Sequence, residues 1–334
     1  MKTFFLTILL LMLTAPLSHA EYPQNGHGTA TLPDNSTYTG EFKNGVFHGQ
    51  GTLVQKNGYR YTGEFRNGLM HGKGEIEFSN GARYVGEMKD GSRSGNGEFI
   101  TPSGDHYTGK FRKGLYNGHG RLEVHTGDVW SGNFVEGQFQ GKGELIRSNG
   151  DILRGEFKNS IPRGRIEFIG RAGHYVGEMQ DGIYHGKGKL ETPNGATFSG
   201  TFDHGYLKGK GSVSYVGGTY DGEFENGLYE GDGVFLSREG YLYAGSFEKG
   251  AFTGRGTIKY PQGGIYMGDV RSWRPHGKGK YLDPESGCQS EGMFENGEFL
   301  GAIENDENLN SDEVSTAICA DPPIPPEQSG KPLT

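Results

Sequence analysis

A pattern of 23 residues returns in register along most of the chain, and this repeat restricts the fold more than any other feature of the sequence. There are about eleven full copies, a partial copy from Ser290 to Gly301, and half a copy from Gly26 to Leu32. A repeat of this length predicts a stack of small units, each of which contacts mainly its neighbours. The full copies begin at Tyr38, Tyr61, Tyr84, Tyr107, Trp130, Leu153, Tyr175, Phe198, Tyr220, Tyr243 and Tyr266.

Each copy is predicted to be one β-hairpin. In the second copy, every other residue from Tyr61 to Phe65 is a ring or a glycine, which is the period of a strand. Asn67-Gly68 then predicts a tight turn, because both residues accept a positive φ. A second alternating stretch runs from Gly74 to Phe78. We therefore expect successive hairpins to pair side by side in one antiparallel sheet.

The composition requires an unusual core. Only 32% of the residues are hydrophobic and 61 are glycine, yet 12% are aromatic. Three uncharged columns are the candidate core: the residues that open the copies, a second column that starts at Phe42, and a third that starts at Leu53. By parity the first two columns share a face, with Gly40 and its equivalents between them, where the missing side chain allows the flanking rings to close over the strand.

Two glycine columns do not vary among the full copies. One runs from Gly40 to Gly268 and the other from Gly49 to Gly277. A glycine that is kept in every copy indicates either a positive φ or a close approach of the backbone to another group. An alanine in place of such a glycine is expected to cost about 1 kcal/mol or more where φ is positive.

The motif Tyr-x-Gly-Glu-Phe-x-Asn-Gly-x-x-His-Gly-x-Gly resembles the MORN repeat, and the resemblance covers roughly residues 26 to 301. It implies an all-β fold, an elongated, solenoid-like rod made of a single antiparallel sheet of about eleven stacked hairpins. At about 9.6 Å per hairpin, such a rod is roughly 100 Å long. The resemblance also implies a scaffold or a dimerisation surface, and membrane or phosphoinositide binding has been proposed for the family.

The sixth copy, Leu153 to His174, departs most from the motif. Ser160 stands at the turn glycine, Pro162 and Arg163 replace the usual aromatic-His pair, and Ile166 replaces the second glycine of Gly-x-Gly. One interpretation is a hinge or recognition point in the array, and the other is sequence drift that the fold tolerates. The eleventh copy also departs, with Trp273 at the turn glycine.

Residues 1–20 are predicted to be a signal peptide that is cut after Ala20. Lys2 precedes an apolar stretch from Phe4 to Leu13, and Ser18-His19-Ala20 is a small-x-small cleavage site. An uncleaved anchor is the alternative. The prediction places the mature protein in the periplasm or outside the cell. Its parts are then residues 21–37 as a partial repeat or cap, 38–301 as the repeat array and 302–334 as a tail.

The sequence contains no pattern typical of a catalytic or cofactor site. The formal net charge of −8 disfavours non-specific nucleic-acid binding. His48 and His71 begin a histidine column, but equivalent residues of neighbouring hairpins lie about 9.6 Å apart, too far for one metal ion. The carboxylates that start at Glu41 repeat one environment, unlike a general acid–base pair. We therefore expect no enzyme activity, no cofactor and no metal.

The function that we predict is a non-enzymatic scaffold or protein–protein interaction module outside the cytoplasm, which binds a protein partner or forms a homodimer. A further apolar column at the turn edge is its candidate interaction strip, and internal packing of these side chains is the alternative. The same strip suggests a second function, peripheral binding to membrane lipid or envelope glycan. The interaction strip consists of Phe47, Met70, Tyr116, Phe139, Tyr184, Leu207, Tyr229 and Phe252.

The tail from Ala302 to Thr334 lacks the repeat and is acidic and then proline-rich, so we expect most of it to be disordered. The two cysteines, Cys288 and Cys319, are an even pair in a chain predicted to be secreted, and they suggest a disulfide, although two free thiols are the alternative. The bond would stabilise the fold by roughly 3–4 kcal/mol in the chain-entropy model. It would hold the start of the tail over the last edge of the sheet, which otherwise invites pairing with another chain.

Overall fold

The computed structural model of the protein describes residues 23–303, 319–323 and 325. All of the secondary structure in this part of the chain is β, and its strands belong to one antiparallel sheet built of successive hairpins. This confirms the predicted fold class. The predicted signal peptide, residues 1–20, lies outside the described residues, as does most of the tail.

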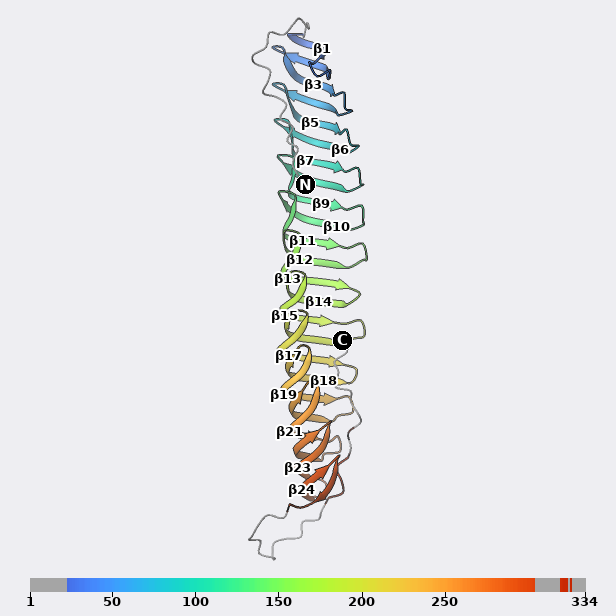
Figure 1. Ribbon diagram of the computed structural model, residues 1–334, viewed down its shortest axis with the longest axis vertical. Helices are drawn as coiled ribbons and strands as arrows, with labels where there is room; N and C mark the ends of the chain where they lie inside the picture. Colours follow the sequence, from blue (N-terminus) through green and yellow to red (C-terminus); the bar gives the residue numbers. More distant parts are fainter. Residues whose placement is uncertain (1–22, 304–318, 324, 326–334) are drawn as a thin grey trace, which may run out of the picture. The chain divides into compact units, whose positions relative to one another are not determined.

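The chain divides into two compact units, Met1–Gln140 and Gly141–Thr334, and the division falls inside strand β11. In each unit the strands follow one another in chain order (Figure 1). The strands that begin in the first unit are β1 (Asn25–Thr31), β2 (Thr37–Lys43), β3 (Val46–Val54), β4 (Arg60–Arg66), β5 (Leu69–Glu77), β6 (Arg83–Lys89), β7 (Ser92–Ile100), β8 (His106–Arg112), β9 (Leu115–Glu123), β10 (Val129–Val135) and β11 (Gln138–Ile146).

The second unit continues with the same alternation of strands, of which the odd-numbered ones are generally the longer. They are β12 (Ile152–Lys158), β13 (Ile161–Gly170), β14 (Gly173–Gln180), β15 (Ile183–Glu191), β16 (Thr197–Asp203), β17 (Tyr206–Tyr215), β18 (Gly218–Glu225), β19 (Leu228–Ser237), β20 (Leu242–Glu248), β21 (Ala251–Lys259), β22 (Ile265–Arg271), β23 (Arg274–Leu282), β24 (Gln289–Glu295) and β25 (Glu298–Gly301). Each predicted full copy corresponds to one even-numbered strand and the odd-numbered strand after it. Strand β1 is the predicted half copy.

The two strands of a copy pair with an irregularity near the first glycine column, for example in β2–β3, β4–β5 and β6–β7. In the first copy Gly40 faces Gly51 but Glu41 faces His48, so Gly49 and Gln50 lie between paired positions. On its other side, strand β3 pairs with β4 without any irregularity. The bulge needs a left-handed residue, and Gly49 has a φ of 55°.

The turns within the hairpins have two consecutive residues with positive φ, as in a type I′ turn. Asn67 has a φ of 51° and Gly68 a φ of 81°. The N–H of Gly68 also donates a hydrogen bond of 2.9 Å to the carbonyl of Phe47 in the preceding hairpin. Ser160 and Trp273 adopt the same conformation without being glycine, with φ values of 64° and 71°.

The ring columns form the core of each unit. Along β2 the residues alternate between exposed and buried, and Tyr38 and Phe42 are both buried on one face. Their rings meet edge to face with centroids 5.1 Å apart, and Tyr38 meets Phe65 of the next copy at 5.0 Å. We call this the inner face of the sheet. Each hairpin is therefore held to the next by aromatic contacts as well as by backbone hydrogen bonds.

The third column is packed differently in the two units. In the first unit Ile76 is buried, while Leu53, Phe99 and Leu122 are only half-buried. In the second unit this column is buried at nearly every copy, and Leu190 is half-buried. The inner face of the first unit therefore leaves more apolar side chain within reach of a ligand or partner.

In the sixth copy a compensating pair of residues replaces the usual tyrosine and glycine. In the copies that open with tyrosine, the ring covers both facing glycines, and a Cβ at Gly51 would lie 2.4 Å from the hydroxyl of Tyr38. Leu153 is shorter and has no hydroxyl, and Ile166, which is fully buried, faces Gly155 in the vacated space. This arrangement explains the departure by packing, which supports tolerated drift rather than a hinge.

Candidate interaction surface

The eight residues of the predicted interaction strip point to the inner face, and the expected exposure of the strip is wrong for half of them. Phe139, Leu207, Tyr229 and Phe252 are buried, and Phe139 is only 1% exposed. Phe47, Met70, Tyr116 and Tyr184 are half-buried. The structure favours the alternative of internal packing, and contact of these residues with a partner stays a prediction.

Pairing across the turn places these side chains on the inner face, and in several hairpins their rings stack on the tyrosine that opens the copy. Across the two-residue turn Phe47 faces Phe42, which places it on the inner face beside the opening tyrosine. Its ring stacks on that of Tyr38 with centroids 3.8 Å apart and an interplanar angle of 14°. Tyr116 and Tyr229 stack in the same way on Tyr107 and Tyr220, each at 3.8 Å.

A different apolar column is the exposed one, and it lies one residue earlier, directly after each hairpin turn. Tyr206 is 58% exposed, Ile183 48% and Leu115 45%. We call this column the turn ridge. In the first unit it consists of Val46, Leu69 and Leu115, and in the second unit of Ile161, Ile183, Tyr206 and Leu228.

Neighbouring members of the turn ridge are brought together by the turns. A Cβ at Gly205 would lie 3.8 Å from Ile183, and one at Gly227 would lie 3.3 Å from Tyr206. Leu69, Ile183 and Tyr206 thus each lie against the turn glycine of the next hairpin. Within the second unit the result is a row of apolar side chains at the hairpin ends.

Parity across the turn is the sequence signal that would have identified the turn ridge. A two-residue turn pairs the last residue before it with the first residue after it, as Lys43 pairs with Val46 and Asp203 with Tyr206. The residues before the turn are mostly charged and lie on the outer face of the sheet, opposite the inner face. The first residue after the turn pairs with them and therefore lies on the outer face too. The ring one residue later must then face inward.

The repeated tyrosines and glutamates have structural partners. The hydroxyl of Tyr61 donates a hydrogen bond of 2.8 Å to the carbonyl of Glu64. The carboxylate of Glu64 in turn accepts a hydrogen bond of 2.9 Å from the N–H of Lys73, which lies in the bulge. Glu41 and Glu87 accept equivalent bonds. These carboxylates therefore stabilise the bulges by hydrogen bonding to their backbone, a role that the sequence analysis did not predict.

Burial raises the pKa of the core tyrosines. Desolvation is the main cause at Tyr38, Tyr84, Tyr107 and Tyr243, each of which has its pKa raised to about 12. Their hydroxyls stay protonated at neutral pH and donate hydrogen bonds to backbone carbonyls. These hydrogen bonds stabilise the repeat.

The histidine column does not converge. His71 Nδ1 lies 3.7 Å from a carboxylate oxygen of Asp90, and His185 Nδ1 lies 3.8 Å from one of Asp203. Among residues 23–303, 319–323 and 325, no group of three or more His, Cys, Asp or Glu side chains is placed to hold a metal ion.

Arg93 is the one charged residue in the column that otherwise holds Phe47, Met70 and the other strip residues. Its guanidinium carbon lies 4.4 Å from the ring centroid of Phe99 and 5.4 Å from that of Phe111. Nη2 donates a hydrogen bond of 2.6 Å to the carbonyl of Gly114, while Nη1 is buried and has no hydrogen-bond partner among the residues that the structure describes. Desolvation lowers the pKa of Arg93 from its ordinary value.

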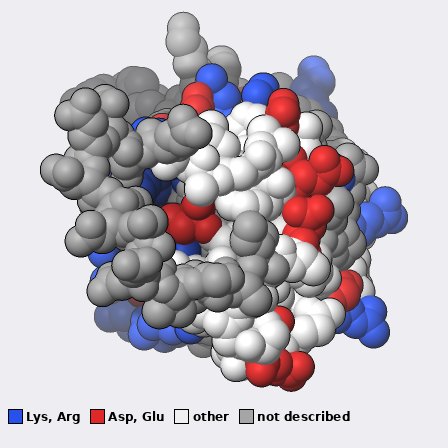
Figure 2. Space-filling view, turned by 90° about the horizontal axis from the view of Figure 1, so that it is seen from below, with Lys and Arg blue, Asp and Glu red and all other residues white. Residues whose placement is uncertain are grey.

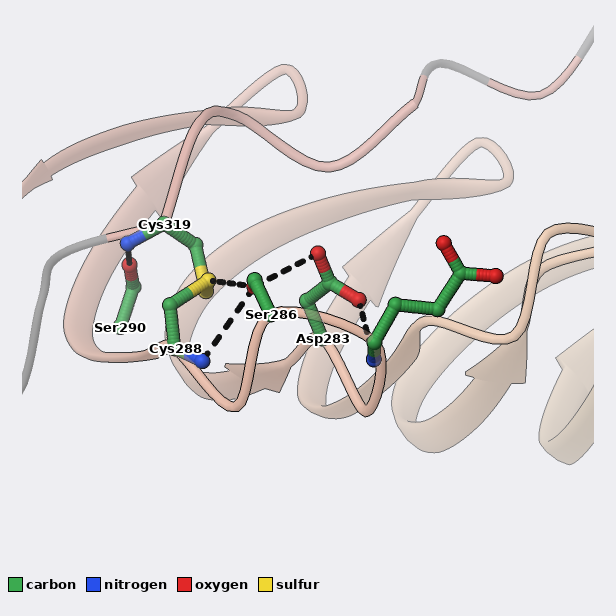
Figure 3. Close-up of a disulfide and its surroundings, with 6 residues drawn as sticks. Asp283, Ser286, Cys288, Ser290 and Cys319 are labelled. Atoms are coloured by element: carbon green, nitrogen blue, oxygen red, sulfur yellow. Dashed lines mark hydrogen bonds between the residues drawn. A yellow bond between two sulfur atoms is a disulfide. The ribbon is translucent and has the colours of Figure 1, made fainter.

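A disulfide joins Cys288, just before β24, to Cys319 in the tail, with the two Cα atoms 5.2 Å apart (Figure 3). The N–H of Cys319 donates a hydrogen bond of 3.1 Å to the hydroxyl of Ser290, and Asp321 accepts one of 2.9 Å from the N–H of Phe299. Pro322 and Pro325 are buried. The described part of the tail is thus attached to β24 and β25.

Figure 2 shows the molecule from below, with Asp and Glu side chains next to a surface of residues other than Lys, Arg, Asp and Glu.

The geometry of this site is that of a repeat array with exposed apolar edges, and comparison with known families agrees. The MORN repeat family matches residues 38–58, 61–83, 84–106, 107–129, 130–152, 175–197, 220–240, 243–265 and 266–287. The chain belongs to the MORN repeat family. The copies that begin at Leu153 and Phe198 are not among the matched residues.

Similarity to individual proteins is weak. No curated protein matches the chain. Among solved structures, the TCP domain of Drosophila melanogaster SAS-4 in complex with a proline-rich motif of Ana2 is 17% identical, with a TM-score of 0.29, over 55% of this chain and 94% of that one. The TCP10 domain of Danio rerio CPAP is 10% identical, with a TM-score of 0.26, over 66% of this chain and 99% of that one. These scores support no inference about function.

The part of the chain that the structure describes contains no helix long and apolar enough to cross a membrane.

Proposed function

We propose that the chain is a non-enzymatic scaffold outside the cytoplasm, which binds a protein partner or a second copy of itself through the turn ridge. The observation that carries this proposal is the row of Ile161, Ile183, Tyr206 and Leu228, which are apolar, adjacent and at least partly exposed. Side chains of this kind gathered on one edge are typical of protein contact surfaces. The repeat family supports a scaffold, and the disulfide supports an oxidising compartment.

Sedimentation velocity of the mature protein, residues 21–334, tests this proposal together with chemical crosslinking to partners in its native compartment. We expect a dimer or a crosslinked complex that is lost when Ile183 and Tyr206 are both replaced by Ser. The control replaces Val216 and Met267, which are also exposed but lie off the ridge. A monomer at every concentration that also crosslinks to no protein would contradict the proposal.

The prediction of binding to membrane lipid or envelope glycan depends on exposed rings in the interaction strip. Phe139 and Tyr229 are buried, which removes much of the support for this prediction. Flotation with neutral and anionic liposomes at physiological salt decides the lipid part. We expect the protein to stay at the bottom of the gradient. Sequencing the N-terminus of the exported protein, expected to begin at Glu21, tests the location.

A further inference from the structure

The hairpin turns carry basic residues in the first unit and acidic residues in the second. The residue before each turn lies beside the turn ridge, because it pairs with the first residue after the turn, as Arg66 does with Leu69 and Glu225 with Leu228. In the first unit, the turns of copies one to four carry Lys43, Arg66, Lys89, Arg112 and Lys113. In the second unit, the turns of copies seven to ten carry Asp181, Asp203, Glu225 and Glu248. We call these two sets the basic edge and the acidic edge.

Each edge is largely of one sign. A turn is counted here as its two central residues and the residue on either side. Asp90 is then the only acid in the turns of copies one to four, and Lys249 the only Lys or Arg in those of copies seven to ten. The remaining turns do not follow this division, since Lys158 and Arg271 lie in the second unit. The members of both edges are exposed, apart from Asp203, which is half-buried.

The basic edge has no counterion in the described part of the chain, where every ion pair of a Lys or Arg involves a residue outside this edge. The acidic edge is partly neutralised. Asp203 lies 2.7 Å from His204 Nδ1 and 3.4 Å from Lys208 Nζ. Lysine nitrogens lie farther from the other members, at 3.9 Å from Glu225 and 3.7 Å from Glu248. Ion pairs between such exposed side chains contribute little, so both edges can still pair with charges from another molecule.

The two edges have the same spacing, because each hairpin contributes one turn. Adjacent hairpins within a unit are about 9.6 Å apart, which is twice the separation of neighbouring strands. A second copy of the chain therefore presents opposite charges at the spacing of each edge. The turn ridge beside the edges supplies apolar side chains, of which Leu115 in the first unit is 45% exposed and Ile183 in the second 48%. A contact between the edges would bury these side chains as well.

We propose that the basic edge of one copy of the chain binds the acidic edge of a second copy. Complementary charges select this pairing of edges, and the turn ridges beside them add apolar contact. A second copy fits better than an unrelated partner, because one kind of contact uses both edges and matches their spacing. A nucleic acid would bind the basic edge alone and is disfavoured by the net charge of −8. The inference rests on the proposed scaffold function and names its partner.

Sedimentation velocity of charge-reversal variants of the mature protein, residues 21–334, tests this inference. The first variant carries Arg66→Glu, Lys89→Glu and Arg112→Glu. The second variant carries Asp181→Lys, Glu225→Lys and Glu248→Lys. Each variant alone has two edges of the same sign, so it should self-associate about ten-fold or more weakly than the wild type. An equimolar mixture of the two variants gives every edge a partner of opposite sign and should restore the complex.

The matched control carries Lys56→Glu, Arg60→Glu and Lys73→Glu. These residues are exposed and lie off both edges, and their replacement changes the net charge as much as the first variant does. We expect the control to associate like the wild type. Association of the wild type should also weaken from about 0.1 M to about 1 M salt, because the screening length falls from about 10 Å to about 3 Å.

Should a triple variant not fold, as judged by its melting curve, Arg112→Glu and Glu225→Lys alone serve in the same mixing experiment. Reversal variants that associate as well as the wild type, or a mixture that stays monomeric, overturn this inference and leave the scaffold function standing. A monomeric wild type also overturns it, whereas the scaffold function fails only if crosslinking recovers no protein partner either.

Discussion

At the scale of single residues, the two unvaried glycine columns meet different steric demands. Gly40 and its equivalents are required by close approach, since a Cβ at Gly40 would lie 2.5 Å from the Cα of Gly51. Gly49 and its equivalents are required by their left-handed backbone, with a φ of 55° at Gly49. The turn glycines form a third set, in which Ser160 is an exception because a non-glycine residue has a φ of 64°.

Replacing Ser160 by Gly should stabilise the protein by about 1 kcal/mol, because glycine adopts a positive φ without the clash of a Cβ. Urea denaturation provides the measurement. The reciprocal change, Gly68→Ser, should destabilise by a similar amount, since a Cβ at Gly68 contacts nothing within 4 Å and only the backbone is strained. If Ser160→Gly is neutral while Gly68→Ser is costly, backbone strain is not what distinguishes the sixth turn.

At the scale of the hairpin, one ring and two glycines act as a unit. The ring of Tyr61 lies 2.4 Å from where a Cβ on Gly74 would stand, so a tyrosine at this position requires the two glycines, and a second solution is a shorter residue with a larger partner. The sixth copy realises the second solution with Leu153 and Ile166. The eighth copy has Phe198 without a hydroxyl, and the closest approach to a Cβ at Gly211 relaxes to 2.9 Å.

A double-mutant cycle of Tyr61→Leu and Gly74→Ile should show strong coupling. Each single change is expected to destabilise the protein by about 2 kcal/mol or more, through a cavity in one case and overpacking in the other. The double variant copies the sixth repeat and should recover about 1–3 kcal/mol relative to the sum. Urea midpoints supply the free energies. Tyr61→Leu combined with the distant Ser160→Gly is the control and should be additive, and additivity in the test pair would refute this account.

At the scale of the whole molecule, the buried tyrosines make stability depend on alkaline pH. A free tyrosine titrates near pH 10, whereas Tyr38, Tyr84, Tyr107 and Tyr243 have pKa values of about 12 when folded. Between these values the folded state binds more protons than the unfolded state, so stability falls as pH rises. Below pH 10 the contribution of these tyrosines is present in full.

We therefore expect the urea midpoint to decrease from pH 10 to pH 12, with little change between pH 8 and pH 9.5 from these groups. Absorbance at 295 nm reports tyrosinate and should rise together with unfolding rather than near pH 10. The opposite outcome is that most tyrosines titrate near pH 10 while the urea midpoint stays constant. That result would show that the folded structure does not protect these hydroxyls from deprotonation.

The disulfide is a further property at this scale, because it ties the tail to β24 and β25. Replacing Cys319 by Ser should destabilise the last copies by roughly 3–4 kcal/mol in the chain-entropy model. Hydrogen exchange can localise the effect, and we expect faster exchange in residues 281–301 and little change in the first unit. Reduction of the wild-type protein should produce the same pattern. An unchanged exchange rate near Ser290 would mean that the strands hold this end without the bond.

Much of the fold could be predicted because the repeat displays its pattern in about eleven copies. The turn residues, such as Asn67-Gly68, locate the hairpins, and alternation along β2 identifies the buried face. The surface was predicted less well. The interaction strip was placed at an exposed edge because Phe47 lies near a turn, yet it stacks on Tyr38. Proximity to a turn does not decide burial, whereas pairing across the turn does.

The sequence by itself determined the repeat, the hairpins, the ring columns and the glycines that they require, because local backbone preferences and period-two alternation act within a single copy. The tertiary structure decided which apolar column is exposed, why Ile166 is compatible with the sixth copy, and that Arg93 lies among rings. Each of these depends on contacts between side chains of facing strands or neighbouring copies. The bulge formed by Gly49 and Gln50 is a further example, because its geometry arises only when the strands pair.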